Sequence, residues 1–337
     1  MIGLNRILLG DAQEMLRKLP PESVDCVVTS PPYFQLRNYQ HDGQLGLEEH
    51  VQLWANELRG VLHEVARVLV PTGSVWLNLG DSYSKGRDGA PFKSLLLGPE
   101  RLALVLIEDG WILRNKVIWA KKNPMPSAVP DRLSCTWEVI YFLTKQKHYF
   151  FDLDAIRAPH TSARPGTKKP VEYSVPPEWR VASTDHGGLA ELKASGRVGH
   201  PLGKNPGDVW HLPTASYHGA HHAVFPLALA ERPILASCPE RRCKLCRSPW
   251  RRETIRKLGH LAVRGDLRPT CGHRSPEPGV VLDPFIGSGT TAIAAEKHGR
   301  RWLGIELNPS FARLAEARIA AARKAQAAGA EGRRRAA

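Results

Sequence analysis

The sequence of 337 residues has no run of 18 apolar residues, and its first residues lack the charged and then apolar pattern of a secretory signal. Its six cysteines are too few and too unevenly spaced for a disulfide framework in a chain of this length. These absences argue against a membrane-spanning or disulfide-built protein. We therefore expect no membrane partner and a cytoplasmic location. Acidic residues are also in deficit, because 33 Asp and Glu stand against 47 Lys and Arg.

This deficit gives a formal net charge of +14 and a sequence pI of about 9.7. Such a charge is typical of proteins that bind a polyanion, most often nucleic acid, and a basic surface without such a partner is the alternative. Hydrophobic residues make up 42% and charged residues 24% of the chain, as in a soluble globular protein. The length suits one large α/β domain with additions, or two modest domains.

Apolar stretches alternate with amphipathic ones along the first 150 residues. Apolar side chains at steps of three and four over residues 47–69 predict a helix, which Pro71 and Gly73 are expected to stop. Further helices are expected at residues 101–109, 227–236 and 290–298, and strands at residues 7–9, 24–28, 74–79, 111–119, 137–143, 280–283 and 302–305. This alternation predicts βαβ units and a mostly parallel sheet.

Two segments interrupt the alternation. Residues 152–204 contain six prolines and no sustained periodicity, which predicts either a disordered insertion or a recognition region built of loops. Residues 238–275 are strongly basic, with eleven Lys and Arg against three Asp and Glu. The chain closes with an Ala-rich segment that carries three arginines at 333–335, and we expect a helix that frays into a basic tail.

The stretch VVLDPFIGSGTTAIAAEKHGRRWLGIELN, residues 280–308, predicts a nucleoside-binding site. An apolar strand ends at Asp283, Gly287 and Gly289 form a turn before a helix, and the next strand ends at Glu306. Glycines at such a turn let a ligand approach the backbone, and the acidic residue suits hydrogen bonds to ribose hydroxyls. A Walker loop is excluded because its Lys-Ser/Thr pair is absent, and the dinucleotide fingerprint is incomplete.

A second informative stretch is TSPPY, residues 29–33, directly after the apolar residues 24–28. Two adjacent prolines make a stiff corner at the end of the expected strand, and a plain strand-ending turn is the alternative interpretation.

The order of these motifs resembles that of S-adenosylmethionine-dependent DNA amino-methyltransferases of the permuted beta class, in which the catalytic motif comes first and the main cofactor motif last. The matching motifs are Gly10-Asp11, Ser30-Pro-Pro-Tyr33, Asn78-Leu-Gly-Asp-Ser82, residues 283–291 and Gly304-Ile-Glu-Leu-Asn308.

The resemblance covers residues 4–160 and 203–318 apart from the basic insert. It implies an α/β, circularly permuted Rossmann-like methyltransferase fold with a mostly parallel sheet and an irregular recognition region. The expected divisions are a catalytic half (1–151), a target-recognition region (152–204), a cofactor-binding half (205–237 and 276–320), the basic Cys/His insert (238–275) and a basic tail (321–337).

The resemblance also implies roles for individual residues. Ser30 Oγ and the Pro31 carbonyl accept hydrogen bonds from the target amine, and Tyr33 stacks on an extruded base. The implied catalytic residues are Ser30, Pro31, Pro32, Tyr33 and Asp81. Those implied for S-adenosylmethionine are Asp11, Asp283, Phe285, Gly287, Gly289, Thr290, Glu306 and Asn308, with Glu306 on the ribose and Asp11 on the adenine.

Three of these roles have structural alternatives: Asp11 as a helix N-cap, Phe285 as plain core, and Asp81 as a turn residue rather than one that orients Ser30 or takes up a proton.

Members of the family with Ser before Pro-Pro usually methylate cytosine N4, whereas Asp or Asn is usual for adenine N6. We therefore expect an N4-cytosine enzyme acting on duplex DNA, with an N6-adenine enzyme and an inactive DNA-binding module as alternatives. Cytosine C5 is disfavoured, because the Pro-Cys dipeptide of that chemistry is absent. The sequence leaves two partners undecided: a second copy of the chain in a homodimer, and a cognate restriction endonuclease.

The basic insert carries two close pairs of metal-ligand residues, C-x-x-C and C-x-H. Two such pairs suit tetrahedral Zn²⁺, so we predict a small zinc-ribbon-like insert with a structural Zn²⁺. Cys238 or His260 could substitute as a ligand, and reduced side chains on a loop without metal are the other interpretation. The positive charge of the insert predicts contact with DNA phosphates. The expected ligands are Cys243, Cys246, Cys271 and His273.

Overall fold

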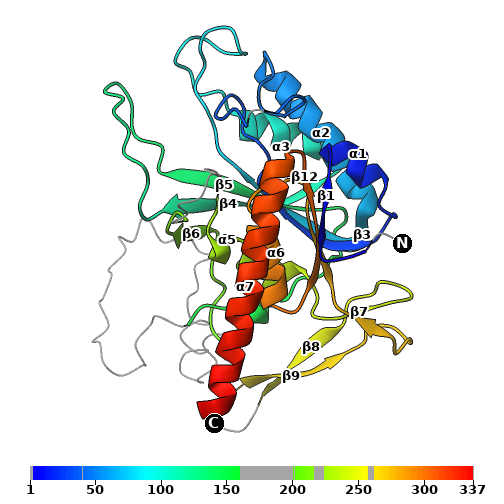
Figure 1. The fold of residues 1–337 in the computed structure, drawn as a ribbon. Coiled ribbons are helices and arrows are strands. Elements are labelled where there is room, and N and C mark those ends of the chain that lie inside the picture. Colours follow the sequence, from blue (N-terminus) through cyan, green and yellow to red (C-terminus); the bar gives the residue numbers. More distant parts are fainter. Residues whose placement is uncertain are drawn as a thin grey trace, which may run out of the picture. The chain divides into compact units, whose positions relative to one another are not determined.

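The computed structural model describes residues 3–39, 41–159, 200, 202–215, 224–256 and 262–336 (Figure 1). The chain divides into two compact units. The larger unit consists of Met1–Asp152, Gly207–Arg252 and Leu267–Ala337, and the smaller of Leu153–Pro206 and Glu253–Asp266. Most of the predicted recognition region, residues 160–199 and 201, lies outside the described residues.

The larger unit is built on a sheet of eight strands in the order β1-β12-β11-β2-β3-β5-β4-β6. Within the described sheet, β5 is antiparallel to both of its neighbours and all other pairings are parallel, which confirms the mostly parallel sheet. The strands are β1 (Arg6–Leu9), β2 (Val24–Thr29), β3 (Leu69–Leu79), β4 (Ile112–Lys121), β5 (Trp137–Thr144), β6 (Val209–Leu212), β11 (Val280–Asp283) and β12 (Arg301–Glu306).

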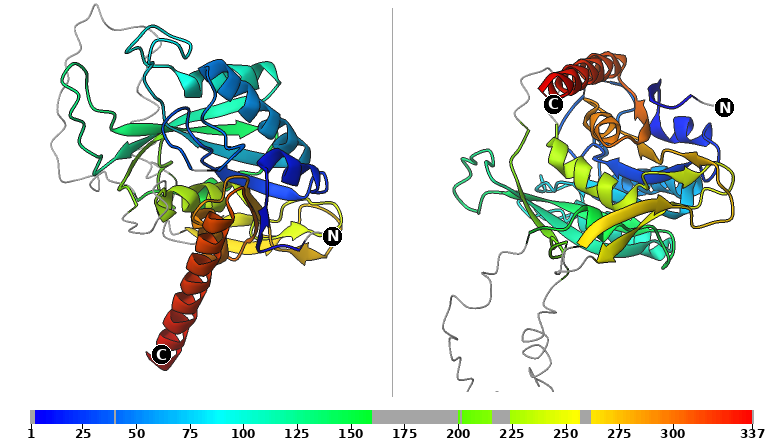
Figure 2. Two further views of the ribbon diagram at one scale, coloured as in Figure 1. Left: turned by 45° about the horizontal axis from the view of Figure 1, so that its top comes forward. Right: turned by 90° about the horizontal axis from the view of Figure 1, so that it is seen from below.

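Helices cover both faces of this sheet (Figures 1 and 2). Alternate strand residues point to opposite faces, so Val27 packs with α1 (Ala12–Arg17), α2 (Val51–Val68) and α3 (Gly98–Glu108). Val28 belongs to the core on the other face, with α5 (Leu227–Ser237), α6 (Thr290–Lys297) and α7 (Pro309–Ala336). Strands β2 and β11 are buried on both faces, which explains their continuous apolar runs.

One predicted boundary is wrong. We expected Pro71 and Gly73 to separate the long helix from the next strand, yet α2 ends at Val68 and both residues lie within β3. The β2–β3 ladder shifts register near this point, and such an irregularity tolerates a residue without an amide hydrogen. A Cβ on Gly73 would lie 2.8 Å from the Asp25 carbonyl oxygen, so the close strand approach requires glycine.

The last helix takes in the segment that we predicted as a basic tail. α7 is continuous from Pro309 to Ala336, so the segment that we predicted as a basic tail, residues 321–337, is helical up to residue 336. Among the described residues, no helix combines the length and the hydropathy needed to cross a lipid bilayer.

The basic insert is divided between the two units. Its ends lie in the larger unit, where β7 (Arg242–Cys243) pairs antiparallel with β10 (Pro276–Glu277). β8 (Arg251–Arg256) and β9 (Ala262–Arg268) form a separate two-stranded sheet. In the smaller unit, Thr254 donates a hydrogen bond to Asp154, which lies in the short helix η1 (Leu153–Ala155). The insert therefore contacts the start of the predicted recognition region, a proximity that the linear order does not show.

Candidate active site

A cavity of about 640 Å³ lies in the larger unit, at the carboxyl ends of the parallel strands. Part of its lining comes from segments at the carboxyl ends of four neighbouring strands. These segments are Gly10–Ala12 after β1, Ser30–Tyr33 after β2, Pro284–Ser288 after β11 and Glu306–Asn308 at the end of β12. The two stretches singled out in the sequence thus meet in one pocket, the usual place for a ligand in an open α/β sheet.

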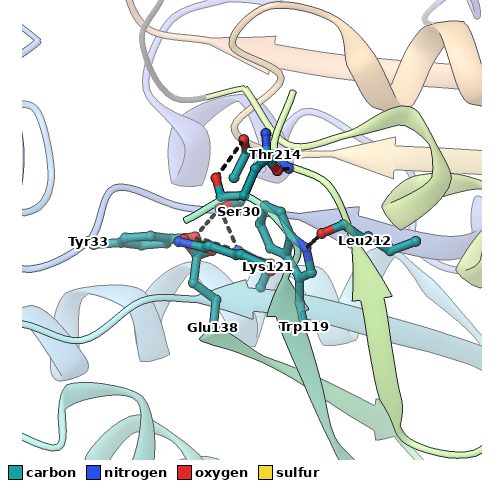
Figure 3. Close-up of polar contacts among 9 residues, drawn as sticks. Ser30, Tyr33, Trp119, Lys121, Glu138, Leu212 and Thr214 are labelled. Carbon is teal, nitrogen blue, oxygen red and sulfur yellow. Dashed lines mark hydrogen bonds and ion pairs between the residues drawn. The ribbon is translucent and has the colours of Figure 1, made fainter. Parts of the chain in front are cut away.

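The proline corner is held rigidly in this pocket. The indole N–H of Trp54 donates a hydrogen bond to the Pro32 carbonyl at 2.9 Å. Ser30 Oγ lies 3.0 Å from the Tyr33 hydroxyl, and the Tyr33 hydroxyl donates to Glu138 Oε2 at 2.7 Å (Figure 3). A Cβ on Gly80 would lie 2.7 Å from the Tyr33 ring, so glycine makes room for this ring.

Glu138 forms the centre of a buried polar cluster that sequence reasoning missed. Its carboxylate also accepts from Lys121 Nζ and from Asn78 Nδ2, each at 2.7 Å. Lys121 and Glu138 are only 19% and 15% exposed, so this ion pair is poorly screened by solvent. Asn78 Nδ2 also lies 3.4 Å from Ser30 Oγ and in contact with the Tyr33 hydroxyl. Burial, with the carboxylate of Glu138 nearby, raises the pKa of Tyr33 well above its ordinary value, so this phenol stays protonated.

One signal for this cluster was available in the sequence. Glu138 is the single charged residue in the apolar stretch WEVIYFL, residues 137–143. A carboxylate in a buried strand needs a partner, and such a residue is a candidate for a functional site. The partner is Lys121 on β4, the strand next to β5 (Figure 3).

The same side of the cavity has an aromatic wall. The Trp119 indole N–H donates to the Leu212 carbonyl at 3.1 Å, and Lys121 Nζ lies 5.3 Å from the centre of the Trp119 ring (Figure 3). Asn123 Oδ1 accepts from the Thr214 backbone N–H at 2.8 Å, which ties the segment after β4 to the segment after β6. All of these residues except Leu212 line the cavity, together with Met125, Pro126 and Phe225.

The opposite side of the cavity is built around Glu306. Its carboxylate accepts from the backbone N–H groups of Gly287 and Asn308, both at 3.0 Å. Burial raises the pKa of Glu306 above its ordinary value. Gly287 has φ of +48°, a conformation that favours glycine. Phe285 and Thr290 also line the cavity, and Phe285 additionally packs against the core, so its position is compatible with both interpretations of that residue.

The position of Asp11 is compatible with both roles that we considered for it. Its carboxylate accepts from the backbone N–H of Glu14 at 3.0 Å and caps α1. The residue also lines the cavity. The capping alternative therefore does not exclude a ligand contact.

Three predicted site residues do not line the cavity. Both oxygens of Asp81 accept from backbone N–H groups, at 3.0 Å from Leu97 and 3.1 Å from Gly98, so Asp81 caps the start of α3. Asp283 is 1% exposed and lies beneath the cavity. Gly289, with φ of +81°, faces α7 rather than the cavity.

Asp283 supports the site from below. Its carboxylate accepts from Thr29 Oγ1 at 2.7 Å, from Thr291 Oγ1 at 2.6 Å and from the Phe285 N–H at 3.1 Å. Burial raises its pKa to about 6. These bonds join the end of β2 to the loop after β11, which are the two segments that carry Ser30 and Phe285.

The predicted metal ligands come together elsewhere in the larger unit. One ligand atom each from Cys243, Cys246, Cys271 and His273 lies within 4.8 Å of the others. Cys238 is buried and is not part of this group, and His260 lies outside the described residues.

Comparisons with known proteins agree with this geometry. The Type II methyltransferase M.XycI of Xanthomonas campestris pv. cyanopsidis is 34% identical over 333 residues, which cover 92% of this chain and 86% of that protein. The solved PvuII DNA methyltransferase, described as cytosine-N4-specific, matches with a TM-score of 0.58 and 18% identity, covering 94% of this chain and 90% of that one. TTHA0409 of Thermus thermophilus, solved in complex with S-adenosyl-L-methionine, matches with a TM-score of 0.54 and 26% identity over 94% and 93% of the two chains. The N6/N4 family model described as DNA methylase matches residues 24–317, and the chain belongs to this family.

Proposed function

We propose that the protein binds S-adenosylmethionine beside Glu306 and methylates the exocyclic N4 of cytosine at a specific site in duplex DNA. The family assignment establishes a DNA methylase of the N6/N4 type. The observation that carries the finer proposal is the Ser30 hydroxyl, held in the cavity by a chain of hydrogen bonds that ends at Glu138.

The residues around Glu306 fit the cofactor. Two backbone N–H groups orient the Glu306 carboxylate, and its remaining lone pairs suit the two hydroxyls of a ribose. Phe285 offers an apolar surface for an adenine ring, and Asp11 offers an acceptor for the adenine amino group. When bound, S-adenosylmethionine supplies a methyl group on a positively charged sulfur. The S-adenosyl-L-methionine complex of TTHA0409 supports this assignment.

The corner at Ser30 suits activation of an aromatic amine. The lone pair of such an amine is delocalised into the ring, so the nitrogen is a poor nucleophile. Hydrogen bonds from its two N–H groups to Ser30 Oγ and the Pro31 carbonyl make it more tetrahedral and aim the lone pair at the methyl group. The two prolines and the bond from Trp54 to Pro32 restrict the movement of that carbonyl.

The same hydrogen bonds offer a route for the proton. Methyl transfer forms a carbon–nitrogen bond, breaks the carbon–sulfur bond, and leaves one excess proton on the amine nitrogen. Because Tyr33 donates to Glu138, its oxygen accepts from the Ser30 hydroxyl, and Ser30 Oγ keeps a lone pair for the amine. Ser30 takes the proton from the nitrogen, Tyr33 takes the proton of Ser30, and Glu138 takes the proton of Tyr33.

The target base has to leave the duplex to reach this pocket. Its amine is inaccessible inside the helix, and extrusion costs a few kcal/mol, which stacking on aromatic side chains offsets. Tyr33 and Trp119 line the cavity and are the rings that we propose for this contact. The nearby Lys121 is paired with Glu138, so its charge holds the carboxylate rather than a DNA phosphate.

Ser30 favours cytosine over adenine, because a serine at this position is usual among the N4-cytosine members that the sequence resembles. A neutral hydroxyl both accepts and donates, which suits an amine beside the acceptor N3 of cytosine. Adenine presents a similar edge at N6 and N1, so the N6-adenine enzyme is the alternative. The designation of relatives as Type II methyltransferases supports a role in restriction and modification, with an endonuclease of the same specificity as a proposed partner.

Mass spectrometry of nucleosides tests the target atom. Duplex DNA treated with the enzyme and S-adenosylmethionine should contain N4-methylcytosine and no N6-methyladenine. The reverse result would refute the assignment to cytosine and leave the methylase family standing. Absence of both products, despite cofactor and DNA binding, would favour the inactive DNA-binding module.

A serine substitution tests the mechanism. Ser30→Ala should retain cofactor and DNA binding but lower kcat by about 100-fold or more, because it removes a contact made in the transition state. Ser310→Ala, an exposed serine at the start of α7, is the matched control and should retain wild-type turnover. Equal kcat for the two variants would contradict the role of Ser30.

A further inference from the structure

The basic insert leaves and rejoins the larger unit at adjacent points. In the β7–β10 pairing, Cys243 stands opposite Pro276 and Arg242 opposite Glu277. The Lys244 N–H donates to the Ser275 carbonyl at 2.8 Å. The two ends of the insert therefore form a narrow neck, and any group that joins them closes a loop of about 30 residues.

Four metal-ligand side chains lie in this neck. Cys243 and Cys246 come from the outgoing segment, and Cys271 and His273 from the returning one. Their ligand atoms lie within 4.8 Å of one another. Tetrahedral zinc with sulfur ligands at about 2.3 Å places the ligand atoms about 3.8 Å apart. Side-chain shifts of about 1 Å thus complete the site.

The chemistry of this set points to zinc in a structural role. The three cysteines are free thiols, and thiolate with imidazole is a ligand set that zinc prefers. Four protein ligands leave no open position for water or substrate, which separates a structural site from a catalytic one.

The neck is anchored to the sheet through Arg242. This side chain is almost fully buried and donates to Asp25 Oδ2 at 2.8 Å, to the Ser23 carbonyl at 2.9 Å and to Glu277 Oε1 at 2.9 Å. Asp25 Oδ2 also accepts from the Val280 N–H at 2.7 Å. Because Val280 begins β11 and Asp25 lies near the start of β2, the neck meets the sheet at the amino ends of its strands. The cavity lies at the carboxyl ends.

We propose that Cys243, Cys246, Cys271 and His273 bind one structural Zn²⁺ that closes the neck of the insert. The ion holds the outgoing and returning segments together and so keeps Arg242 in place against Asp25. It takes no part in methyl transfer, since it lies at the opposite end of the sheet from Ser30. This inference does not depend on which base is methylated.

Metal analysis of the full chain, purified without a polyhistidine tag, tests the proposal. The wild type should carry one zinc ion per chain after dialysis. Cys246→Ser combined with Cys271→Ser should remove it, lower the melting temperature and open residues 238–275 to protease. Cys135→Ser, an exposed thiol outside the group, is the control and should keep the zinc.

A cobalt experiment keeps the test independent of folding defects. Wild-type protein loaded with Co²⁺ should show the intense visible absorption of a tetrahedral ion and thiolate-to-cobalt charge transfer. His273→Cys should still bind one metal ion and should increase the charge-transfer intensity, because it adds a fourth thiolate. Wild-type protein that lacks zinc and gives only an octahedral Co²⁺ spectrum would overturn the proposal. A charge-transfer band that Cys246→Ser leaves unchanged would overturn the ligand set.

Discussion

At the scale of single residues, two carboxylates near the cofactor motif have different tasks. Glu306 lines the cavity and is oriented by two backbone N–H groups. Asp283 is sealed beneath the cavity, where two threonine hydroxyls and one N–H satisfy it. Both follow an apolar strand in the sequence, but only Glu306 can touch a ligand directly. The function that we assign to Asp283 is to join the two halves of the site.

The buried position of Asp283 predicts a dependence of stability on pH. Its pKa in the folded protein is about 6, against an ordinary value of 3.8, so the folded state binds more protons than the unfolded state between these values. The stability that Asp283 contributes is therefore fully present below about pH 4 and is lost as the pH rises to about 6. The loss amounts to up to about 3 kcal/mol.

Asp283→Asn should remove this dependence. The difference in unfolding free energy between wild type and variant, from urea titrations at intervals between about pH 4 and 7, should change across this window and level off above about pH 6. The exposed Asp42→Asn is the control. If Asp283→Asn and Asp42→Asn show parallel pH profiles, the proposed protonation of Asp283 is wrong.

At the scale of elements, the turn between β11 and α6 serves two partners. Gly287 faces the cavity, whereas Gly289 at the start of α6 faces α7. A Cβ on Gly289 would lie 3.0 Å from Ile319 and 3.4 Å from Ala315. In the G-x-G motif the first glycine thus lines the cavity, and the second makes room for the packing of α7.

Two glycine substitutions separate backbone strain from this packing. Gly289 and Gly299 both have positive φ, +81° and +67°, but a Cβ on Gly299 would meet nothing within 4 Å. Gly299→Ala should cost about 1 kcal/mol, from strain alone. Gly289→Ala should cost at least about 1 kcal/mol more, because it also crowds α7. Urea denaturation midpoints, analysed with a shared m-value, measure the difference in unfolding free energy between the two variants. Equal losses of stability would show that α7 accommodates the added methyl group at no energetic cost.

At the scale of the whole molecule, recognition and catalysis are assigned to different parts of the chain. The smaller unit combines residues 153–206 with residues 253–266 of the insert. Asp154 accepts from Thr254 and also pairs with Arg157 at 2.5 Å. These contacts bring part of the insert to the start of residues 152–204. That the insert assists recognition and contacts DNA phosphates stays a prediction.

Exchange of the recognition segment tests this assignment. Residues 160–199 are replaced by the corresponding segment of a relative, so that Asp154, Arg157 and Thr254 are retained. The methylated sequence, read by sequencing the DNA of an expressing host, should change to that of the donor, with N4 of cytosine still the modified atom. As a control, exchange of the 28 residues of α7 for those of the same relative should leave the methylated sequence unchanged. If the methylated DNA sequence does not change, the residues that recognise it lie elsewhere in the chain.

Local patterns were sufficient for the family, the mostly parallel sheet and much of the cavity. Motif order and the residues that follow apolar strands pointed to Ser30, Asp11, Gly287 and Glu306, and all four line the cavity, because the carboxyl ends of parallel strands meet at one edge. The zinc-ligand spacing likewise predicted four side chains that the structure brings together. These features depend on short stretches of sequence and on rules that hold for every parallel sheet.

Tertiary structure alone decided which polar groups meet. Glu138, paired with Lys121, is linked to Ser30 through Tyr33 because antiparallel β5 lies between β3 and β4, an order that no local pattern specifies. Only the structure shows that the Glu306 side chain lines the cavity whereas the Asp283 side chain is buried beneath it. Asp81 caps α3 because its carboxylate accepts from the backbone N–H groups of Leu97 and Gly98, which lie more than ten residues further along the chain. Each of these outcomes depends on atoms that are distant in sequence, and their meeting is fixed only when the whole core packs.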